Sequence, residues 1–258
     1  MRRNYRFGQK LTKGLSNVKA KNISMYAKIS QEANEAVFSG ITFADFIECE
    51  SIQVENLLLL KSSYIGDKQC YNFQLLEGKD DIAKLALENI YHYGDFCFVD
   101  YANPESVRQL TGEQIAELLY MAHLFKPLKS PFLDTLQNNY VYLSHDDGWY
   151  CKLYGKEQQN FILILLGKLL KCLQKDFCNT VSSLPEKLVE KVAELSVHGL
   201  FIQLDIPKQR NKTTKKNKVA LIRLYKVGEY KNMDDLFNNI EHLQSQSSFE
   251  IATGTGKS

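Results

Sequence analysis

Apolar and polar residues alternate in three pairs of short segments, and a turn or loop joins the members of each pair. The pairs span residues 54–76, 140–154 and 200–227. Successive strand residues point to opposite faces of a sheet, so this alternation is typical of strands. We predict three antiparallel hairpins, and the run of leucines at 57–60 indicates that the first strand of the first hairpin is buried on both faces.

The central hairpin, 140–154, contains the turn signal Asp147-Gly148, and its loop length decides which side chains share a face. A two-residue loop would place Leu143 opposite Lys152 and would mix apolar with polar side chains. A three-residue loop, 146–148, instead puts His145 on an apolar face with Trp149. We predict the three-residue loop, with an opposite, solvent-facing side that carries Tyr140, Tyr142, Ser144, Tyr150, Lys152 and Tyr154.

Apolar positions at three- and four-residue spacing predict helices before, between and after the hairpins. The segments are 24–38, 82–90, 115–125, 158–176, 183–198 and 233–243. Thr111 and Gln114 match a capping box, because each side chain can accept a hydrogen bond from the other residue's backbone N–H. A short buried strand is predicted over 95–101, and residues 41–52 fit a strand or a short helix equally well.

Hairpins and helices follow one another without the regular strand-helix-strand alternation of a doubly wound sheet. We therefore predict the α+β class, with a mainly antiparallel sheet built from the three hairpins and packed with helices. Residues 1–21 are expected to be a flexible basic arm and 249–258 a flexible tail. The segment 22–248 is expected to be a single α+β domain, with a subdivision near 155 as an alternative.

The composition indicates a soluble cytoplasmic protein. Of 258 residues 44% are hydrophobic, enough for a sizeable core. The six cysteines include no Cys-x-x-Cys pair and lie mostly in apolar segments, which is typical of reduced core residues. No apolar region follows the first arginines, as a secretory signal requires, and the longest apolar run, Phe161 to Leu166, is too short to span a membrane.

The net charge of +2 conceals a strongly uneven distribution. Residues 1–21 hold seven basic side chains and no acidic one, and residues 208–218 hold six and no acidic one. Without these thirteen, 19 basic side chains face 30 acidic ones, so two basic segments are attached to an acidic body. The basic side chains expected to contact nucleic acid or an acidic protein are Arg2, Arg3, Arg6, Lys208, Arg210, Lys212, Lys215, Lys216 and Lys218.

We therefore expect a binding module that uses the basic segments and the tyrosine-rich face of the central hairpin, without a cofactor or a bound metal. The simpler alternative is that the basic residues form a solvated arm and a solvated loop. The basic loop contains no aromatic residue to stack on bases.

An enzymatic alternative centres on His145 and Asp146, which together offer a general base and a carboxylate at the hairpin loop. His92 and Asp100, beside the predicted strand 95–101, could join them in a hydrolase site, with or without a metal. The structural alternative is that Asp146 and Asp147 form the turn and that His145 stacks against Trp149.

The last seven residues, Ala-Thr-Gly-Thr-Gly-Lys-Ser, resemble motif I, the Walker A loop, of helicase-type P-loop ATPases. The resemblance covers 252–258 and implies that Gly254 and Gly256 shape a phosphate cradle, Lys257 reaches the terminal phosphates and Ser258 binds Mg²⁺. Ile251 stands where the motif usually has Gly or Ala, and 249–251 could be the preceding strand. Two interpretations are open: an accessory domain whose motor begins here, or a coincidental match in the tail.

Overall fold

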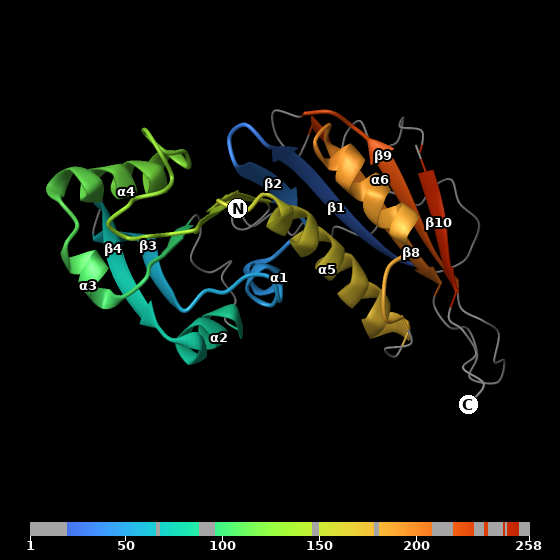
Figure 1. The fold of residues 1–258 in the computed structure, drawn as a ribbon, viewed down its shortest axis with the longest axis horizontal. Helices are drawn as coiled ribbons and strands as arrows, with labels where there is room; N and C mark the ends of the chain where they lie inside the picture. The colour runs from blue at the N-terminus through green and yellow to red at the C-terminus, as the bar shows by residue number, and fades with distance from the viewer. Residues whose placement is uncertain are drawn as a thin grey trace. The chain divides into compact units, whose positions relative to one another are not determined.

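The computed structural model describes residues 20–65, 68–87, 96–145, 150–177, 181–207, 219–229, 235–236, 245 and 247–252. Over these residues the chain forms ten strands and six helices (Figure 1). The strands are β1 (Ala20–Ser30), β2 (Glu35–Ser39), β3 (Asn56–Ile65), β4 (Lys68–Glu77), β5 (Phe96–Asp100), β6 (Tyr140–His145), β7 (Tyr150–Gly155), β8 (Leu200–Pro207), β9 (Val219–Lys226) and β10 (Ser247–Ala252). The helices are α1 (Phe43–Ile47), α2 (Lys79–Leu87), α3 (Pro104–Arg108), α4 (Gly112–Leu124), α5 (Gln159–Phe177) and α6 (Glu186–Ser196).

The chain divides into two compact units. The central unit comprises Tyr26–Lys168, and the terminal unit comprises Met1–Met25 together with Leu169–Ser258. The strands of the predicted hairpins pair as expected, β3 with β4, β6 with β7 and β8 with β9, and all three pairs are antiparallel. The α+β class with an antiparallel sheet built from hairpins is thereby confirmed.

The sheet of the central unit has the strand order β1-β2-β7-β6-β5-β3-β4. Its first face, the α4 face, contributes Leu58, Val99 and Leu143 to a buried cluster that also includes Leu118 and Met121 of α4. The Thr111–Gln114 capping box predicted at the start of α4 is present, with both backbone N–H groups bonded to the opposite side chain. Helix α4 therefore covers one face of this sheet.

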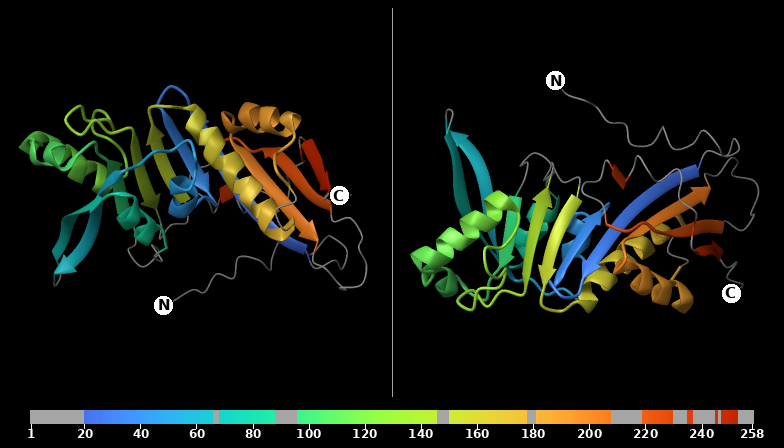
Figure 2. Two further views of the ribbon diagram at one scale, coloured as in Figure 1. Left: turned by 60° about the horizontal axis from the view of Figure 1, so that its bottom comes forward. Right: turned by 90° about the horizontal axis from the view of Figure 1, so that it is seen from above.

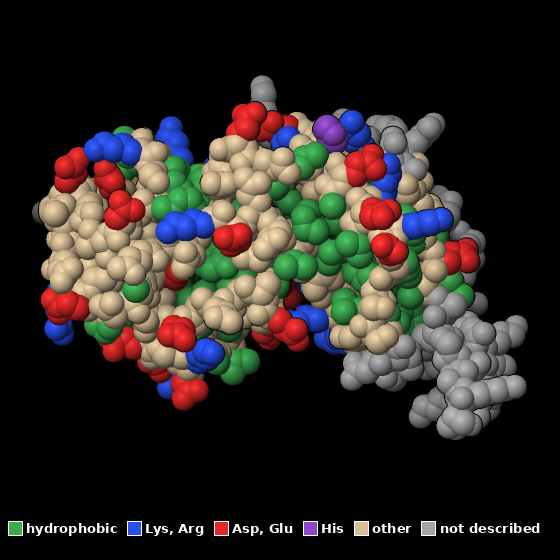
Figure 3. All heavy atoms as spheres, in the orientation of Figure 1, with side chains coloured by type: hydrophobic (Ala, Val, Ile, Leu, Met, Phe, Trp, Pro, Cys, Tyr) green, Lys and Arg blue, Asp and Glu red, His purple; other side chains and the backbone are tan. Residues whose placement is uncertain are grey.

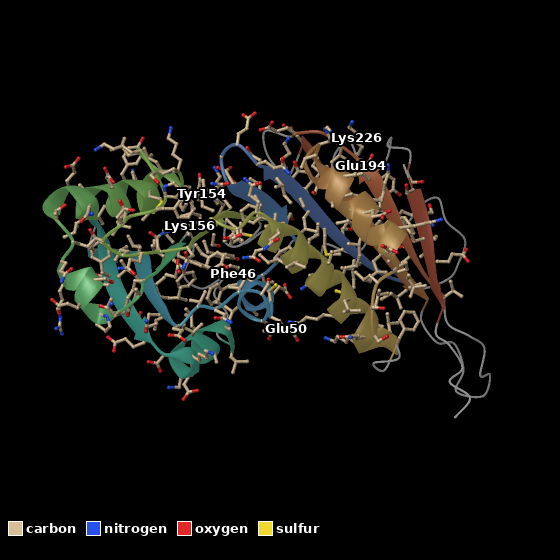
Figure 4. The ribbon with its side chains drawn as sticks, in the orientation of Figure 1. Phe46, Glu50, Tyr154, Lys156, Glu194 and Lys226 are labelled. Atoms are coloured by element: carbon tan, nitrogen blue, oxygen red, sulfur yellow. The ribbon has the colours of Figure 1, made fainter. Side chains whose placement is uncertain are left out.

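The second face of the same sheet, the aromatic face, packs against α1. Phe43 stacks on Phe98 with ring centroids 4.5 Å apart. Phe46, labelled in Figure 4, meets Tyr140 edge-on with ring centroids 5.6 Å apart. Residues 41–52, which fitted a strand or a helix, contain helix α1, whose N-cap Thr42 forms a capping box with Asp45. Because helices lie on both faces, the inner strands of the central unit are buried on both sides.

In the terminal unit, α6 packs against one face of β8 and β9 (Figures 1 and 2). The strand order there is β10-β9-β8-β1. Residues Ser247–Ala252, which include 249–252 of the expected tail, form β10 and pair antiparallel with β9. As a strand, this segment pairs its backbone N–H and C=O groups with those of β9 and buries the Ile251 side chain. These two gains explain why it is a strand.

The helix predicted over 24–38 is wrong, because the segment forms the hairpin of β1 and β2 with Ala27 opposite Phe38. Met25 and Ile29 are four residues apart, and residues at that spacing share a face in a strand as well as in a helix. The turn between the strands ends at Asn34, which has a left-handed φ of 50°. Asparagine tolerates this conformation better than most residues, so the turn favours the hairpin.

The predicted register of the central hairpin is also wrong. Leu143 lies opposite Lys152, and His145 opposite Tyr150, as in the register that we rejected. The rejection assumed that one face meets solvent, but every residue of β6 is buried. The prediction that the tyrosines of this hairpin face solvent is wrong for the same reason. Tyr140 is 7%, Tyr142 3% and Tyr154 3% exposed.

Helix α5 is the longest helix of the described residues, and neither it nor any shorter one among them is long and apolar enough to cross a membrane.

Candidate nucleic-acid interface

Strands β8 and β9 of the terminal unit flank the basic segment 208–218 on both sides. Their alternating inner side chains are fully or almost fully buried: Leu200, Ile202, Leu204, Ile206, Ala220, Ile222 and Leu224. On α6, Leu188, Val192 and Leu195 are buried at three- and four-residue spacing. The apolar faces of the strands and of the helix therefore form the core that fixes this hairpin.

The outer face of β8 and β9 carries polar side chains that bond to one another. The Arg223 guanidinium forms an ion pair with Asp205, and the Tyr225 hydroxyl donates a hydrogen bond to Gln203 Oε1 at 3.0 Å. Phe201 packs beside Tyr225 with ring centroids 5.8 Å apart. Because Asp205 neutralises Arg223, this described face offers no excess of positive charge.

Positive charge also does not gather on the described surface of α6. Figure 3 shows basic and acidic side chains interspersed over the face that carries this helix. Lys191, for example, pairs with Glu194 at 2.7 Å. Neither of these two described surfaces therefore concentrates positive charge.

Both basic segments lie outside the described residues, apart from residues 20–21 of the expected arm, which begin β1. The structure nevertheless fixes where the second segment is attached. The residues on either side of it are Pro207 of β8 and Val219 of β9, and these strands pair in register from Leu200↔Lys226 to Asp205↔Leu221. The six cations are therefore tethered at the end of one hairpin.

His145, the proposed general base, is buried between two aromatic rings of the central unit. Its imidazole lies 4.3 Å from the Phe125 ring and 4.6 Å from the Tyr150 ring, centroid to centroid. Burial, with a smaller contribution from the Lys152 charge, lowers the pKa of His145 to about 4. Its Nε2 is buried and has no hydrogen-bond partner among the described residues. The side chain is thus enclosed in the protein.

Asp100 has a structural role at the end of β5. Its carboxylate accepts hydrogen bonds from the backbone N–H groups of Asn139, at 2.9 Å, and Tyr140, at 2.6 Å. Burial raises the pKa of Asp100 to about 6, although these N–H groups act in the opposite direction. The carboxylate fixes the chain at the point where β6 begins.

The structure does not bring His145 and Asp100 together. Phe96 of β5 lies opposite Ser144 of β6, so Asp100 shares a face with Ser144 and not with His145. Asp100 is also level with Tyr140, five residues from His145, which is roughly 17 Å along an extended strand. His92 and Asp146 lie outside the described residues, and within those residues no group of three His, Cys, Asp or Glu side chains could hold a metal ion.

The residues implied by the Walker A resemblance, Gly254, Gly256, Lys257 and Ser258, lie outside the described residues. The strand anticipated before them is present, since β10 ends at Ala252. It is hydrogen-bonded to β9 in antiparallel orientation.

The sequence interpretation did not single out the outer face of β8 and β9 as a surface beside the basic segment. The signal was available in the alternation of Gln203 and Asp205 with buried leucines and isoleucines. What the alternation does not contain is the pairing of Arg223 with Asp205, which depends on the register of the two strands.

Comparisons with protein-family models, with curated proteins and with solved structures gave no match to this chain.

Proposed function

We propose that the protein is a nucleic-acid-binding module and that the segment 208–218, at the end of the β8–β9 hairpin, is its principal contact with phosphates. The observation that carries the proposal is the attachment of six cations and no acid to two strands whose pairing is fixed. A phosphate backbone is attracted by such a concentration of charge whatever its base sequence.

The composition of the segment favours nucleic acid over an acidic protein. Besides the six cations it contains Gln209, two asparagines and two threonines, and it has no apolar residue. Protein interfaces bury an apolar and aromatic centre, which this segment cannot supply. Lys, Arg, Thr, Asn and Gln are all side chains that donate hydrogen bonds to phosphate oxygens.

The hairpin also confines the charge in space. At about 3.5 Å per residue, the middle of an eleven-residue connection can reach no farther than roughly 20 Å from the strand ends. Double-stranded DNA carries one phosphate charge per ~1.7 Å of axis, so several phosphates fall within that reach. The cations can therefore act on one site together.

Six cations predict a steep dependence of affinity on salt. If all six neutralise phosphates of duplex DNA, the logarithm of the association constant falls with the logarithm of salt concentration with a slope of about −5. The segment carries no aromatic residue, so we expect little preference among base sequences.

The test is a fluorescence-anisotropy titration of the full chain with labelled duplex DNA, single-stranded DNA and RNA at several salt concentrations. Supporting results are binding at low salt and, with duplex DNA, a slope of log affinity against log salt of about −3 or steeper. Absence of binding at the lowest salt concentration contradicts the proposal. Binding to an acidic polypeptide with equal affinity would redirect it to an acidic protein partner.

A second candidate function, nucleotide binding at 252–258, is favoured by one observation. The strand β10 ends at Ala252, directly before the Gly-rich sequence, as the strand-loop arrangement of a phosphate-binding loop requires. The loop would act only when followed by a helix whose N-terminus faces the phosphates. The test uses a chain extended beyond Ser258. ATP binding by this chain, and its loss in the Lys257→Ala variant, would support the function. Equal ATP binding by the extended chain and its variant would contradict it.

A further inference from the structure

Strand β4 forms one edge of the central unit's sheet. It is last in the strand order, so β3 pairs with its inner side and no described strand pairs with its outer side. The outer N–H and C=O groups of an edge strand can pair with a strand from another chain.

The edge lacks the features that usually prevent such pairing. Residues 69–76 include no charged residue and no proline. The register with β3 runs without a bulge from Asn56↔Glu77 to Ile65↔Lys68. Proteins commonly protect exposed edges with lysine, proline or a bulge, so a long, regular and uncharged edge is a site for strand addition.

The far half of this hairpin has few partners of its own. Over the described residues, β5 pairs with Leu57–Lys61 of β3, and the described partners of Ser62–Ile65 are those of β4. Figure 2 shows this hairpin projecting at the margin of the central unit. A two-stranded ribbon is only marginally stable in water, and additional strands stabilise it.

The side chains of β4 divide into an apolar and an amide-bearing side. Phe73 and Leu75 point to the α4 face and are 43% and 44% exposed. Asn72 and Gln74 are exposed on the aromatic face. A partner strand that presents apolar residues on the first face and amides on the second would match both.

We propose that β4 is a homodimer interface, in which the strand pairs antiparallel with β4 of a second copy in a register centred on Phe73. A two-fold axis perpendicular to the sheet keeps the same face upward in both copies, so apolar side chains meet apolar side chains. Phe73 then lies opposite its own copy, and Asn72 lies opposite Gln74. The paired region is 69–77.

Charge and polarity favour this register over the one centred on Asn72. Centred on Phe73, the pairing places Glu77 opposite residue 69, a glutamine, so no like charges meet. Centred on Asn72, it would place Leu76 opposite residue 68, a lysine, and Leu75 opposite the glutamine. A second copy is the occupant that supplies an uncharged strand of matching length and matching pattern on both faces.

The interface consists of one strand pair and a few side chains. It falls below the ~1,200 Å² of standard interfaces, so we expect a dissociation constant on the order of 10 µM. Sedimentation velocity of the full chain over a wide concentration range tests this directly. A monomer–dimer equilibrium is expected, and a chain that stays monomeric throughout the range overturns the proposal.

The variant Phe73→Lys places two ammonium groups opposite each other and is expected to raise the dissociation constant about tenfold or more. Leu163→Lys is the matched control, because Leu163 of α5 is also 43% exposed. Circular dichroism is the check that both variants are folded. Equal dimerisation by Phe73→Lys and the wild type, or a loss caused by the control alone, places the interface elsewhere and overturns the proposal.

A cross-linking variant keeps the proposal testable if Phe73→Lys does not fold. Phe73→Cys is expected to give an added disulfide-linked dimer on mild oxidation, relative to the wild type with its native cysteines. Asn72→Cys is expected to give much less, because its nearest copy lies diagonally. Equal dimer yields from the two variants, or none from either, contradict the register and the interface.

Discussion

The imidazole of His145 stacks almost parallel on the phenol ring of Tyr150, with the planes inclined by 12°. These two residues are a cross-strand pair of β6 and β7. Phe125, which ends α4 in a left-handed conformation with φ 52°, lies against the same imidazole. A left-handed conformation is unfavourable for a bulky residue, so we infer that packing on His145 helps to hold it.

This enclosure predicts that acid destabilises the protein through His145. The pKa of His145 is lowered from 6.5 to about 4, because burial disfavours the imidazolium and the Lys152 charge adds to this. Below pH 6.5 the unfolded chain binds a proton that the folded chain does not, until the pH falls to about 4. The expected loss over this window is on the order of 3 kcal/mol, measured by urea unfolding at a series of pH values.

His145→Phe retains a ring between Phe125 and Tyr150 and cannot be protonated. We expect this variant to lose less unfolding free energy in acid, because it lacks the protonation of His145. As the pH falls, the variant should therefore become more stable relative to the wild type. His123→Phe, at an exposed position of α4, is the control. Parallel pH profiles for the wild type and His145→Phe would contradict the prediction.

Asp100 predicts the opposite pH dependence. Burial raises its pKa from 3.8 to about 6, so its contribution to stability is complete below pH 3.8 and is lost as the pH rises to about 6. Asp100→Asn removes this titration but offers one acceptor oxygen in place of two. We expect the wild type to be more stable by about 1 kcal/mol near pH 4 and the variant to be more stable above pH 7.

Chemical unfolding at the two pH values measures this reversal. Asp134→Asn, at an exposed position, is the control and should show no reversal. If the wild type instead gains stability over Asp100→Asn as the pH rises, then the N–H groups of Asn139 and Tyr140 outweigh the cost of burying the charge.

The sequence was sufficient for the three hairpins because alternation over 54–76, 140–154 and 200–227 reports directly on strands. It was insufficient for β1, since the spacing of Met25 and Ile29 fits both a strand and a helix. It was also insufficient for the register of the central hairpin. That register could be chosen only by knowing that helices cover both faces of β6, which is a tertiary property.

For the candidate site, composition alone located the cations of 208–218, and the predicted hairpin placed them between β8 and β9. The enclosure of His145 by Phe125 was not predictable, because Phe125 is twenty residues away in sequence and approaches only through the packing of α4. The separation of His145 from Asp100 likewise depends on the β5–β6 register.

Gly199, which precedes β8, is predicted to tolerate no side chain. It has φ +84°, and a Cβ there would lie 1.9 Å from the Gly228 carbonyl oxygen. The Gly199 carbonyl in turn accepts a hydrogen bond from the Val227 N–H at 2.8 Å, so the two segments cannot separate without losing it. We expect Gly199→Ala to cost about 3 kcal/mol or more, measured by thermal or urea unfolding.

Gly228→Ala separates the two causes. Gly228 has φ +79°, but a Cβ there would meet nothing within 4 Å. Its substitution should cost only about 1 kcal/mol, which is the conformational penalty alone. If the two substitutions cost the same, the clash of a Cβ with the Gly228 carbonyl adds nothing to the cost of Gly199→Ala.

Neutralising part of the basic segment is predicted to weaken nucleic-acid binding without changing the fold. Lys215→Gln/Lys216→Gln removes two of the six cations, so the slope of log affinity against log salt for duplex DNA should become shallower by about 2. The matched control is Lys175→Gln/Lys187→Gln, which removes the same charge from exposed positions of the terminal unit. If both double variants reduce the slope equally, net charge governs binding and the hairpin loop is not the contact.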